Sequence, residues 1–271
     1  MPELPEVEIT RRGIVPHVLG QRVEQVIIRQ PKLRWPVPQI LTTELAGQTI
    51  EDIVRRAKYL LLHTHRGCLI LHLGMSGSLR VLPAAIPAGK HDHVDLVLAN
   101  GVYLRLRDPR RFGAVLWTQE EVQKHPLLAR LGPEPWDPGF SGVYLYGLAR
   151  ARSAAVKSLI MDAGVVVGVG NIYANEALFR AGIHPNREAR RVSRQRYEVL
   201  VRAIRAVLEE AIQQGGTTLR DFTRSDGRPG YFAEALAIYQ RAGQACGRCG
   251  ATIRKLRSLQ RTSFYCPHCQ R

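Results

Sequence analysis

The chain has 271 residues, a length that suits one large domain or two ordinary ones, and its hydrophobic content of 45% is enough for a sizeable core. Lysine and arginine number 39 against 23 acidic residues, a formal net charge of +16 that attracts polyanions, nucleic acid first and an acidic membrane surface second. No apolar run approaches the roughly 20 residues that span a bilayer, and the acidic, proline-containing start is unlike a signal peptide, so we expect a cytoplasmic protein.

The chain opens with MPELPEVE, at a position where chain ends usually fray. Pro5 suits the first position of a helix, and the acidic Glu6 and Glu8 suit its first turn. Pro16 and Gly20 limit the far end of that helix. The sequence therefore predicts a helix that opens at Pro5 and ends between Pro16 and Gly20.

The segment from about Arg22 to Trp117 carries short runs rich in Val, Leu and Ile, among them YLLLHTH, CLILHL and VYLRLR. Asn100-Gly101 between two such runs is the strongest short hairpin signal. Many short strands at this spacing are typical of a sandwich or a barrel. We therefore predict a β domain after the first helix.

The segment LGPEPWDPGF, residues 131–140, is rich in turn-forming residues and indicates a domain boundary. Beyond it, residues 141–162 and 193–214 carry apolar side chains at helical spacing, and Gly215-Gly216 ends the second segment. The segment TRSDGRPGYF, residues 223–232, is then expected to form a mobile loop. We therefore predict a helical region followed by a loop.

The C-terminal segment holds two cysteine pairs in a C-x2-C-x16-C-x2-C pattern. Four thiolates in two tight pairs suit one tetrahedral zinc ion with no open coordination position, so the metal would be structural. Two disulfides are the alternative, which the expected cytoplasmic context disfavours. His268 lies inside the second pair and is not expected to bind the metal. The predicted ligands are Cys246, Cys249, Cys266 and Cys269.

In VVVGVGNIYANEALF an apolar run enters a Gly-x-Gly turn and then a helix that we expect Asn171 to cap. The unpaired N–H groups of a helix N-terminus can bind an anion. A plain turn is the commoner meaning of Gly-x-Gly, and no Walker lysine follows.

The segment RLRDPRRFGAV places Arg110, Arg111 and Phe112 on a turn between two strands. An exposed basic hairpin tip is the default interpretation. The functional interpretation is a wedge in which an aromatic side chain enters the base stack. Met75 in HLGMSGS could be a second apolar wedge, although its spacing alone favours a core methionine.

Two further segments carry basic residues. Lys58 in RRAKYLL could start a strand, and His91 in KHDHVD lacks a third ligand at helical spacing that would indicate a metal site. For His91 we expect hydrogen bonding or phosphate contact instead.

Taken together and in this order, PELPEVE, HLGMSGSL, KHDHVDL, DPRRFG, VVVGVGNIYANE, SDGRPGYF and the cysteine pairs form a specific combination. In these motifs the chain resembles, over essentially its whole length, the bacterial formamidopyrimidine-DNA glycosylase family. Enzymes of that family remove 8-oxoguanine and ring-opened purines from DNA.

The resemblance implies an α+β multidomain fold. Residues 1–133 would form the N-terminal helix and β-sandwich, residues 134–236 a helical domain with a helix–two-turns–helix motif, and residues 237–271 a zinc-finger β-hairpin. Damaged double-stranded DNA would be the partner, one structural Zn²⁺ the cofactor, and the protein a monomer that acts on the bacterial nucleoid.

The resemblance also implies site residues. The extruded nucleotide would leave a gap that Met75, Arg110 and Phe112 fill, with Arg110 facing the orphaned cytosine. A loop from Arg220 to Phe232, including Tyr231, would cover the damaged base. Phosphates around the flipped nucleotide would be held by Lys58, His91, Arg111, Arg152, Asn171 and Arg261, of which Lys58 and Arg261 would also donate protons.

The resemblance gives the unusual N-terminus a role. Once Met1 is removed, Pro2 is a secondary amine, and α-amines have a pKa of roughly 7.7–8.0 against about 10.4 for lysine. Such an amine can attack the sugar C1′ and form an iminium ion. Glu3 would transfer protons and Glu6 would support the site.

Two alternatives stay open at this point. A sister glycosylase for oxidised pyrimidines would share Pro2, Glu3 and the zinc finger, although PELPEVE and DPRRFG favour the purine enzyme. A non-catalytic zinc-ribbon protein that binds DNA or RNA would explain the charge and the cysteines but not the Pro-Glu start.

Overall fold

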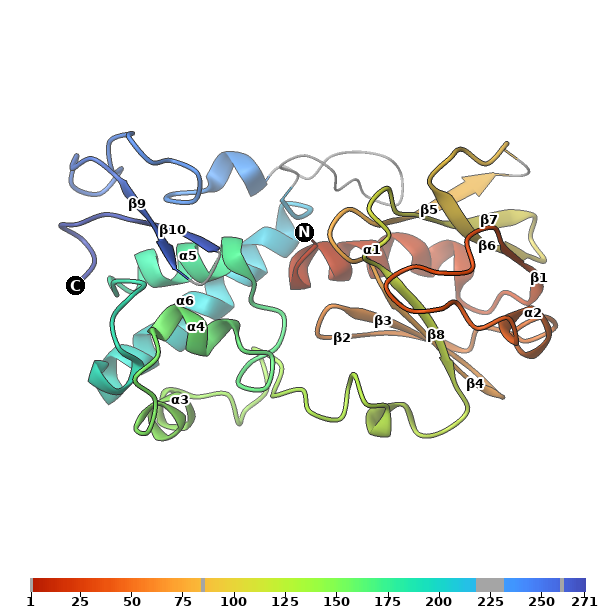
Figure 1. The fold of residues 1–271 in the computed structure, drawn as a ribbon, viewed down its shortest axis with the longest axis horizontal. Helices are drawn as coiled ribbons and strands as arrows, with labels where there is room; N and C mark the ends of the chain where they lie inside the picture. The colour runs from red at the N-terminus through yellow and green to blue at the C-terminus, as the bar shows by residue number, and fades with distance from the viewer. Residues whose placement is uncertain (1, 84–85, 218–231, 259–260) are drawn as a thin grey trace. The chain divides into compact units, whose positions relative to one another are not determined.

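The structure is a computed structural model that describes residues 2–83, 86–217, 232–258 and 261–271. It divides into two compact units (Figure 1). The first unit comprises residues 1–129 and 214–233, and the second comprises residues 130–213 and 234–271. Our expected division at residues 133 and 236 stays a prediction.

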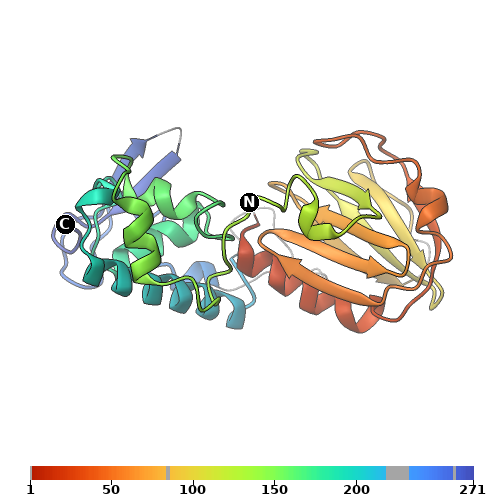
Figure 2. The same cartoon turned by 90° about the horizontal axis from the view of Figure 1, so that it is seen from below.

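Two four-stranded antiparallel sheets make up most of the first unit. Figure 2 shows them face to face, and their apolar side chains form one core between them. Of the sandwich and the barrel that the short apolar runs indicated, the structure shows the sandwich, which confirms the fold that the resemblance implied. One sheet has the order β1 (Val23–Ile28), β6 (Asp92–Leu98), β7 (Val102–Arg107), β5 (Ser78–Pro83), and the other the order β2 (Asp52–Arg56), β3 (Tyr59–Thr64), β4 (Gly67–His72), β8 (Ala114–Thr118).

Helix α1 (Leu4–Val18) lies along one open side of this sandwich, where it contacts the edge strands β2 and β5. Its buried Leu4, Val7 and Ile14 face the core. Glu3 is the N-cap of the helix, so the helix starts one residue before the predicted Pro5. The shorter elements α2 (Leu41–Glu44) and η1 (Val122–Lys124) complete the first unit.

The second unit is helical and carries a two-stranded hairpin. The segment 141–162 divides into two helices, because residues 150–155 leave the helical path. Helix α6 (Arg194–Gln213) packs against α3 (Gly142–Ala149) and α5 (Asn171–Arg180), and Tyr173 and Tyr197 are buried in the core of this unit. The elements are α3 (Gly142–Ala149), α4 (Val156–Met161), α5 (Asn171–Arg180), η2 (Ala189–Arg191), α6 (Arg194–Gln213), β9 (Arg254–Ser258) and β10 (Arg261–Tyr265). The short η3 (Phe232–Ala235) spans the point in the sequence where the chain passes from the first unit to the second.

Two buried side chains of α5 fix the hairpin and the chain segment ahead of it. Glu176 accepts hydrogen bonds from the backbone N–H groups of residues 237, 238 and 239, at 2.8 to 3.0 Å. Asn175 accepts one from the N–H of Phe264 at 2.7 Å. A carboxylate that accepts several N–H bonds is well satisfied without a cation. The hairpin and the helices therefore share one compact unit.

A buried ion cluster stabilises the first sheet. Arg105 donates to both oxygens of Asp95, at 2.9 and 2.8 Å, and Arg29 donates to the same carboxylate at 2.7 Å. Burial alone would raise the pKa of Asp95, but the hydrogen bonds from Arg105 and Arg29 lower it below its ordinary value. The cluster therefore stabilises the fold above the ordinary pKa of aspartate, and this contribution is lost as the pH falls.

We expect Asp95→Ala to lower the free energy of unfolding by about 3–5 kcal/mol, because it leaves the charge of Arg105 buried without its main partner. Urea denaturation at pH 7 measures this loss. The control is Glu24→Ala in the exposed Arg22–Glu24 pair, which should cost at most about 1 kcal/mol. Equal losses in the two variants would contradict the assignment.

Candidate functional site

The start of the chain is held in a buried setting. Pro2, Glu3 and Glu6 are all buried. One carboxylate oxygen of Glu6 accepts the N–H of Glu3 at 2.8 Å, as part of a capping box, and the other accepts the N–H of Thr217 at 2.8 Å. Glu6 therefore ties the first residues to a segment more than two hundred positions away, within the same unit.

The expected lesion loop is only partly described. Arg220 and Tyr231 lie outside the described residues, as does most of the segment 223–232. Phe232 is fully buried, and its N–H donates to the carbonyl of Gly216 at 3.1 Å. The two ends of the segment, at Thr217 and Phe232, thus lie close to each other in the first unit.

Lys58 lies in the tight turn between β2 and β3, next to Ala57 with a φ of +54°. It is half-buried and stands at the end of the turn instead of inside a strand. The positive φ of Ala57 shows that this two-residue hairpin loop uses a left-handed conformation, as tight hairpins do.

His72 is a candidate that sequence reasoning missed. Its Nδ1 accepts the N–H of Gly74 at 2.9 Å, and its ring lies against Tyr59. Burial, with the charges of Lys58 and Arg34 nearby, lowers the pKa of His72 to about 4. The ring is therefore neutral at pH 7 and carries its proton on Nε2, which leaves a fixed donor beside Lys58. The only feature of the sequence that could have pointed to His72 is its place in HLGMSGS, the motif that carries Met75.

The predicted wedge residues lie at the surface. Met75 is 37% exposed and Phe112 is 44% exposed, so the interpretation of Met75 as a core residue is wrong. The guanidinium of Arg110 lies 4.9 Å from the centre of the Phe112 ring. Arg111 is exposed and has a φ of +56°, which turns the chain sharply, and His91 is half-buried.

In the second unit the start of α5 meets the start of β10. The Asn171 side chain donates to the carbonyl of Thr262 at 3.2 Å, next to the exposed Arg261. The N-cap of α5 is Gly170, so the expectation that Asn171 caps the helix is wrong. Arg152, also in this unit, pairs with the exposed Asp162 at 3.2 Å.

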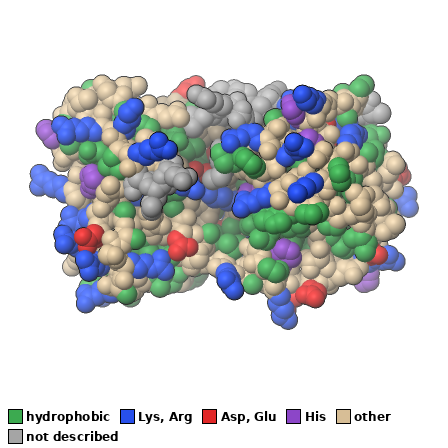
Figure 3. Space-filling view, viewed as in Figure 1, with side chains coloured by type: hydrophobic (Ala, Val, Ile, Leu, Met, Phe, Trp, Pro, Cys, Tyr) green, Lys and Arg blue, Asp and Glu red, His purple; other side chains and the backbone are tan. Residues whose placement is uncertain are grey.

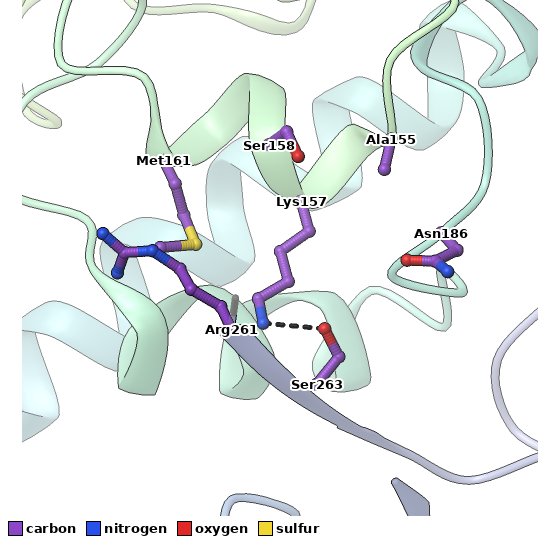
Figure 4. A pocket seen from close by; sticks show the side chains of 7 residues that line it. All are labelled: Ala155, Lys157, Ser158, Met161, Asn186, Arg261 and Ser263. Carbon is purple, nitrogen blue, oxygen red and sulfur yellow. Dashed lines mark hydrogen bonds between the residues drawn. The ribbon is translucent and has the colours of Figure 1, made fainter. Parts of the chain in front are cut away.

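A cavity of about 210 Å³ lies beside Arg261, between α4 and β10 (Figure 4). Lys157 enters it from α4 and donates to the Ser263 hydroxyl at 2.7 Å and to the Thr262 carbonyl at 3.1 Å. Lys157 is buried and joins the helix to the strand that carries Arg261. This lysine was not singled out from the sequence.

The four paired cysteines converge. Their sulfur atoms all lie within 4.8 Å of one another, with 3.9 Å between Cys246 and Cys269 and 3.4 Å between Cys249 and Cys266. A tetrahedral zinc ion with bonds of about 2.3 Å needs sulfurs about 3.8 Å apart. Disulfide bonds are about 2.0 Å long, so these thiols are free. The donor set therefore fits one structural zinc ion.

On the face shown in Figure 3, Lys and Arg side chains are more abundant than Asp and Glu side chains. No helix among the described residues is long and apolar enough to cross a membrane. The surface charge matches the polyanion partner expected from composition.

Comparisons with known proteins cover almost the whole chain. Residues 1–115 match the formamidopyrimidine-DNA glycosylase N-terminal domain, residues 131–223 the H2TH domain of the same enzyme, and residues 243–271 the zinc finger found in FPG and IleRS. Formamidopyrimidine-DNA glycosylases of Alkalilimnicola ehrlichii and Syntrophotalea carbinolica are 60% and 58% identical to the chain, and each alignment covers all of both proteins.

Solved structures agree with these matches. The MutM (FPG) protein of Thermus thermophilus is 38% identical, with a TM-score of 0.89 over 99% of this chain and 98% of that one. A Lactococcus lactis FPG mutant in complex with DNA that contains Fapy-dG is 32% identical, with a TM-score of 0.91 and full coverage of both chains. With its N-terminal domain, H2TH domain and four-cysteine finger all matched, the chain belongs to the formamidopyrimidine-DNA glycosylase family.

Proposed function

We propose that the protein is a bifunctional DNA glycosylase and AP lyase that removes oxidised purines, 8-oxoguanine and formamidopyrimidines, from duplex DNA. The observation that carries this proposal is the buried start of the chain, where Glu6 holds Glu3 and Thr217. Its support from relatives is the Lactococcus lactis complexes with DNA that contains Fapy-dG or an abasic site. The protein acts as a monomer in the bacterial cytoplasm, where the nucleoid lies.

In this proposal Pro2 is the nucleophile. Its nitrogen bonds to the sugar C1′, the bond from C1′ to the base breaks, and the base leaves with a proton. The sugar ring then opens to give an iminium ion, a strong electron sink. Loss of a C2′ proton expels the 3′ phosphate, and a second elimination expels the 5′ phosphate. Water finally hydrolyses the iminium and restores the amine.

Glu3 carries protons in these steps, because its carboxylate lies next to the nucleophile in the chain and its backbone is fixed by Glu6. Glu6 is a positioning residue, since both of its oxygens hold backbone N–H groups. Burial excludes water from these carboxylates, which strengthens their interactions with developing charge.

The remaining candidates bind DNA. Lys58, His72, His91 and Arg111 hold phosphates from the first unit, and Met75, Arg110 and Phe112 fill the gap left by the extruded nucleotide. Arg152, Asn171 and Arg261 hold phosphates from the second unit. Lys58 and Arg261 also supply protons to leaving oxygens, and Arg220, Tyr231 and Phe232 belong to the segment that covers the base.

The zinc ion has a structural role. When bound, it would join the four thiolates that close the hairpin of β9 and β10, and it would take no part in the reaction. Through the bonds of Asn175 and Glu176 to the finger, a folded hairpin keeps Arg261 beside Asn171.

One observation favours a second substrate class. A Lactococcus lactis FPG has been solved in complex with DNA that contains an oxidised pyrimidine, and it is 32% identical to this chain. Excision rates rank the two substrate classes, oxidised purines and oxidised pyrimidines. They are measured on matched duplexes that carry 8-oxoguanine or oxidised thymine, each opposite cytosine or adenine. A protein that binds both duplexes but nicks neither would be a non-catalytic zinc-ribbon protein.

We expect Cys249→Ser to lose the zinc ion and to weaken DNA binding and nicking together, because the closed site holds the finger in shape. Zinc content by mass spectrometry and the Kd for a lesion duplex measure this. Cys68→Ala, which changes the buried fifth cysteine outside the cluster, should keep the zinc. Normal binding with lost chemistry in Cys249→Ser would show that the metal acts in the reaction.

We expect Arg110→Ala to lower the preference for cytosine over adenine opposite 8-oxoguanine by about ten-fold, since a good base contact is worth roughly 1–3 kcal/mol of discrimination. Excision rates on the two duplexes give the ratio. Arg111→Ala is the matched control, because a lost phosphate contact weakens binding to both duplexes alike. An unchanged ratio in Arg110→Ala would make Arg110 another phosphate contact.

We expect borohydride, added during the reaction, to trap a covalent adduct that peptide mapping places at Pro2. Glu3→Gln should bind the lesion duplex normally and fail to release the base, because an amide cannot transfer the proton. Glu24→Gln, at an exposed site, should react like the unchanged protein. A protein shown by mass spectrometry to retain Met1 should be inactive, since its Pro2 nitrogen is an amide, and normal excision by it would refute this mechanism.

A further inference from the structure

We propose that Asp108 is a positioning residue that joins the Met75 loop to the Arg110–Phe112 turn, so that the two insert into DNA as one rigid wedge. This inference rests on the proposed function, in which these side chains fill the gap left by an extruded nucleotide. It assigns a role to a residue that touches neither the base nor the phosphates.

The side chain of Asp108 connects the two segments directly. Asp108 is fully buried. Its Oδ1 accepts the hydroxyl of Ser76 at 3.0 Å and the N–H of Arg110 at 3.3 Å, and its Oδ2 accepts the N–H of Gly113 at 2.7 Å. Ser76 directly follows Met75, whereas Arg110 and Gly113 bracket the turn that carries Phe112. One carboxylate therefore holds both parts of the wedge.

The backbone of Asp108 adds further links. Its N–H donates to the carbonyl of His91 at 3.0 Å. Its carbonyl accepts the N–H of Arg111 at 3.2 Å and contacts the Nε2 of His93 at 2.8 Å, so this nitrogen carries the proton. The candidate phosphate contact His91 and the wedge thus share one buried anchor.

The two segments also touch without side chains between them. Gly74 has a φ of +63°, and a Cβ at this position would stand 2.4 Å from the nitrogen of Gly113 and the carbonyl carbon of Phe112. Only glycine permits such an approach. Gly77 bonds back to the carbonyl of Leu73 at 2.8 Å, which closes the Met75 loop on itself. The segments therefore form one packed body.

The carboxylate of Asp108 holds these two segments and does not pair with a neighbouring arginine among the described residues. Within the described part of the chain, no ion pair includes Asp108, and its side-chain oxygens accept only from neutral donors. Arg110 lies over the Phe112 ring instead. The guanidinium groups of Arg110 and Arg111 thus keep their charge for DNA, while the carboxylate satisfies backbone N–H groups that would otherwise be buried without partners.

A wedge that is rigid before it binds loses less conformational freedom when it inserts. We therefore expect loss of the anchor to harm the steps that need an ordered wedge, which are extrusion of a paired base and inspection of the opposite cytosine. Strand cleavage at a preformed abasic site needs less extrusion, because there is no base to unstack.

Two variants test the anchor. Asp108→Asn keeps the size of the side chain but replaces one of its two acceptor oxygens with an NH2 group. The N–H of either Arg110 or Gly113 then faces that NH2 group and loses its acceptor. Ser76→Ala removes only the bond between the two segments. Ser78→Ala is the matched control, because Ser78 is equally buried, on β5, and outside the Asp108 cluster.

We expect Asp108→Asn to slow excision of 8-oxoguanine about ten- to a hundred-fold and Ser76→Ala about five-fold, the sizes of an unsatisfied buried donor and of one lost hydrogen bond. Both should slow cleavage of an abasic duplex less. Asp108→Asn should also lower the cytosine-over-adenine preference, although Arg110 itself is unchanged. Ser78→Ala should leave all three readouts as they are.

The proposal is overturned if excision and abasic-site cleavage fall by the same factor while the opposite-base preference holds, since that pattern indicates general destabilisation. Thermal unfolding identifies that case, and Ser76→Ala decides the question if Asp108→Asn does not fold. Failure of the unchanged protein to excise 8-oxoguanine would instead refute the proposed function. If the unchanged protein prefers cytosine over adenine opposite the lesion and the variants keep that preference, only the proposed role of Asp108 is refuted.

Discussion

The carboxylate of Glu6 is the constraint on which the order of the N-terminus, and so the proposed chemistry there, depends. It holds the N–H of Glu3 with one oxygen and the N–H of Thr217 with the other, both at 2.8 Å. A chain end held this way cannot fray, although chain ends usually do. In the proposed mechanism the amine of Pro2 is the nucleophile, which requires a position as reproducible as that of a side chain in a packed core, and the hydrogen bonds of Glu6 supply that order.

Buried carboxylates that accept hydrogen bonds from backbone N–H groups recur elsewhere in this basic protein. Asp108 accepts from Ser76, Arg110 and Gly113, and Glu176 accepts from three successive backbone N–H groups ahead of the finger. In each case a buried acid accepts hydrogen bonds from backbone N–H groups, and at least one of its partners lies in a distant segment, which for Asp108 is the hydroxyl of Ser76. With a net charge of +16, the chain has few acids, and several of the buried ones order loops while the surface cations stay available for DNA.

The Asp95 cluster differs from these anchors, because its carboxylate pairs with arginine side chains and not with backbone N–H groups. There, Arg29 and Arg105 are paired with a carboxylate inside the first sheet, and they serve the stability of the sandwich. Both arginines count toward the net charge, yet the guanidinium of Arg105 is buried and that of Arg29 is bound to the same carboxylate. The net charge therefore overstates the DNA-binding surface, and only the structure separates structural arginines from those such as Arg110 that lie in solvent.

Local patterns were enough to predict several features. The zinc cluster and the alternation of short strands follow from spacing within a few residues, and the four sulfur atoms do converge as the spacing requires. The wrong expectations concern features that depend on backbone angles or packing. Gly170 caps α5 because its own φ and ψ suit that position, and Met75 is exposed because the loop between Gly74 and Gly77 turns it outward from the sandwich.

Sequence alone thus determined the zinc ligands, the preference for a polyanionic partner and the possible reactivity of an N-terminal Pro-Glu pair. Each of these is a property of neighbouring residues or of the total composition. Tertiary structure decided the roles of Asp108, His72 and Glu6. Thr217 lies 211 positions from Glu6 and Ser76 lies 32 positions from Asp108, while the lowered pKa of His72 comes from its burial. A carboxylate becomes an anchor only when folding buries it beside particular N–H groups, and spacing in the sequence cannot specify that meeting.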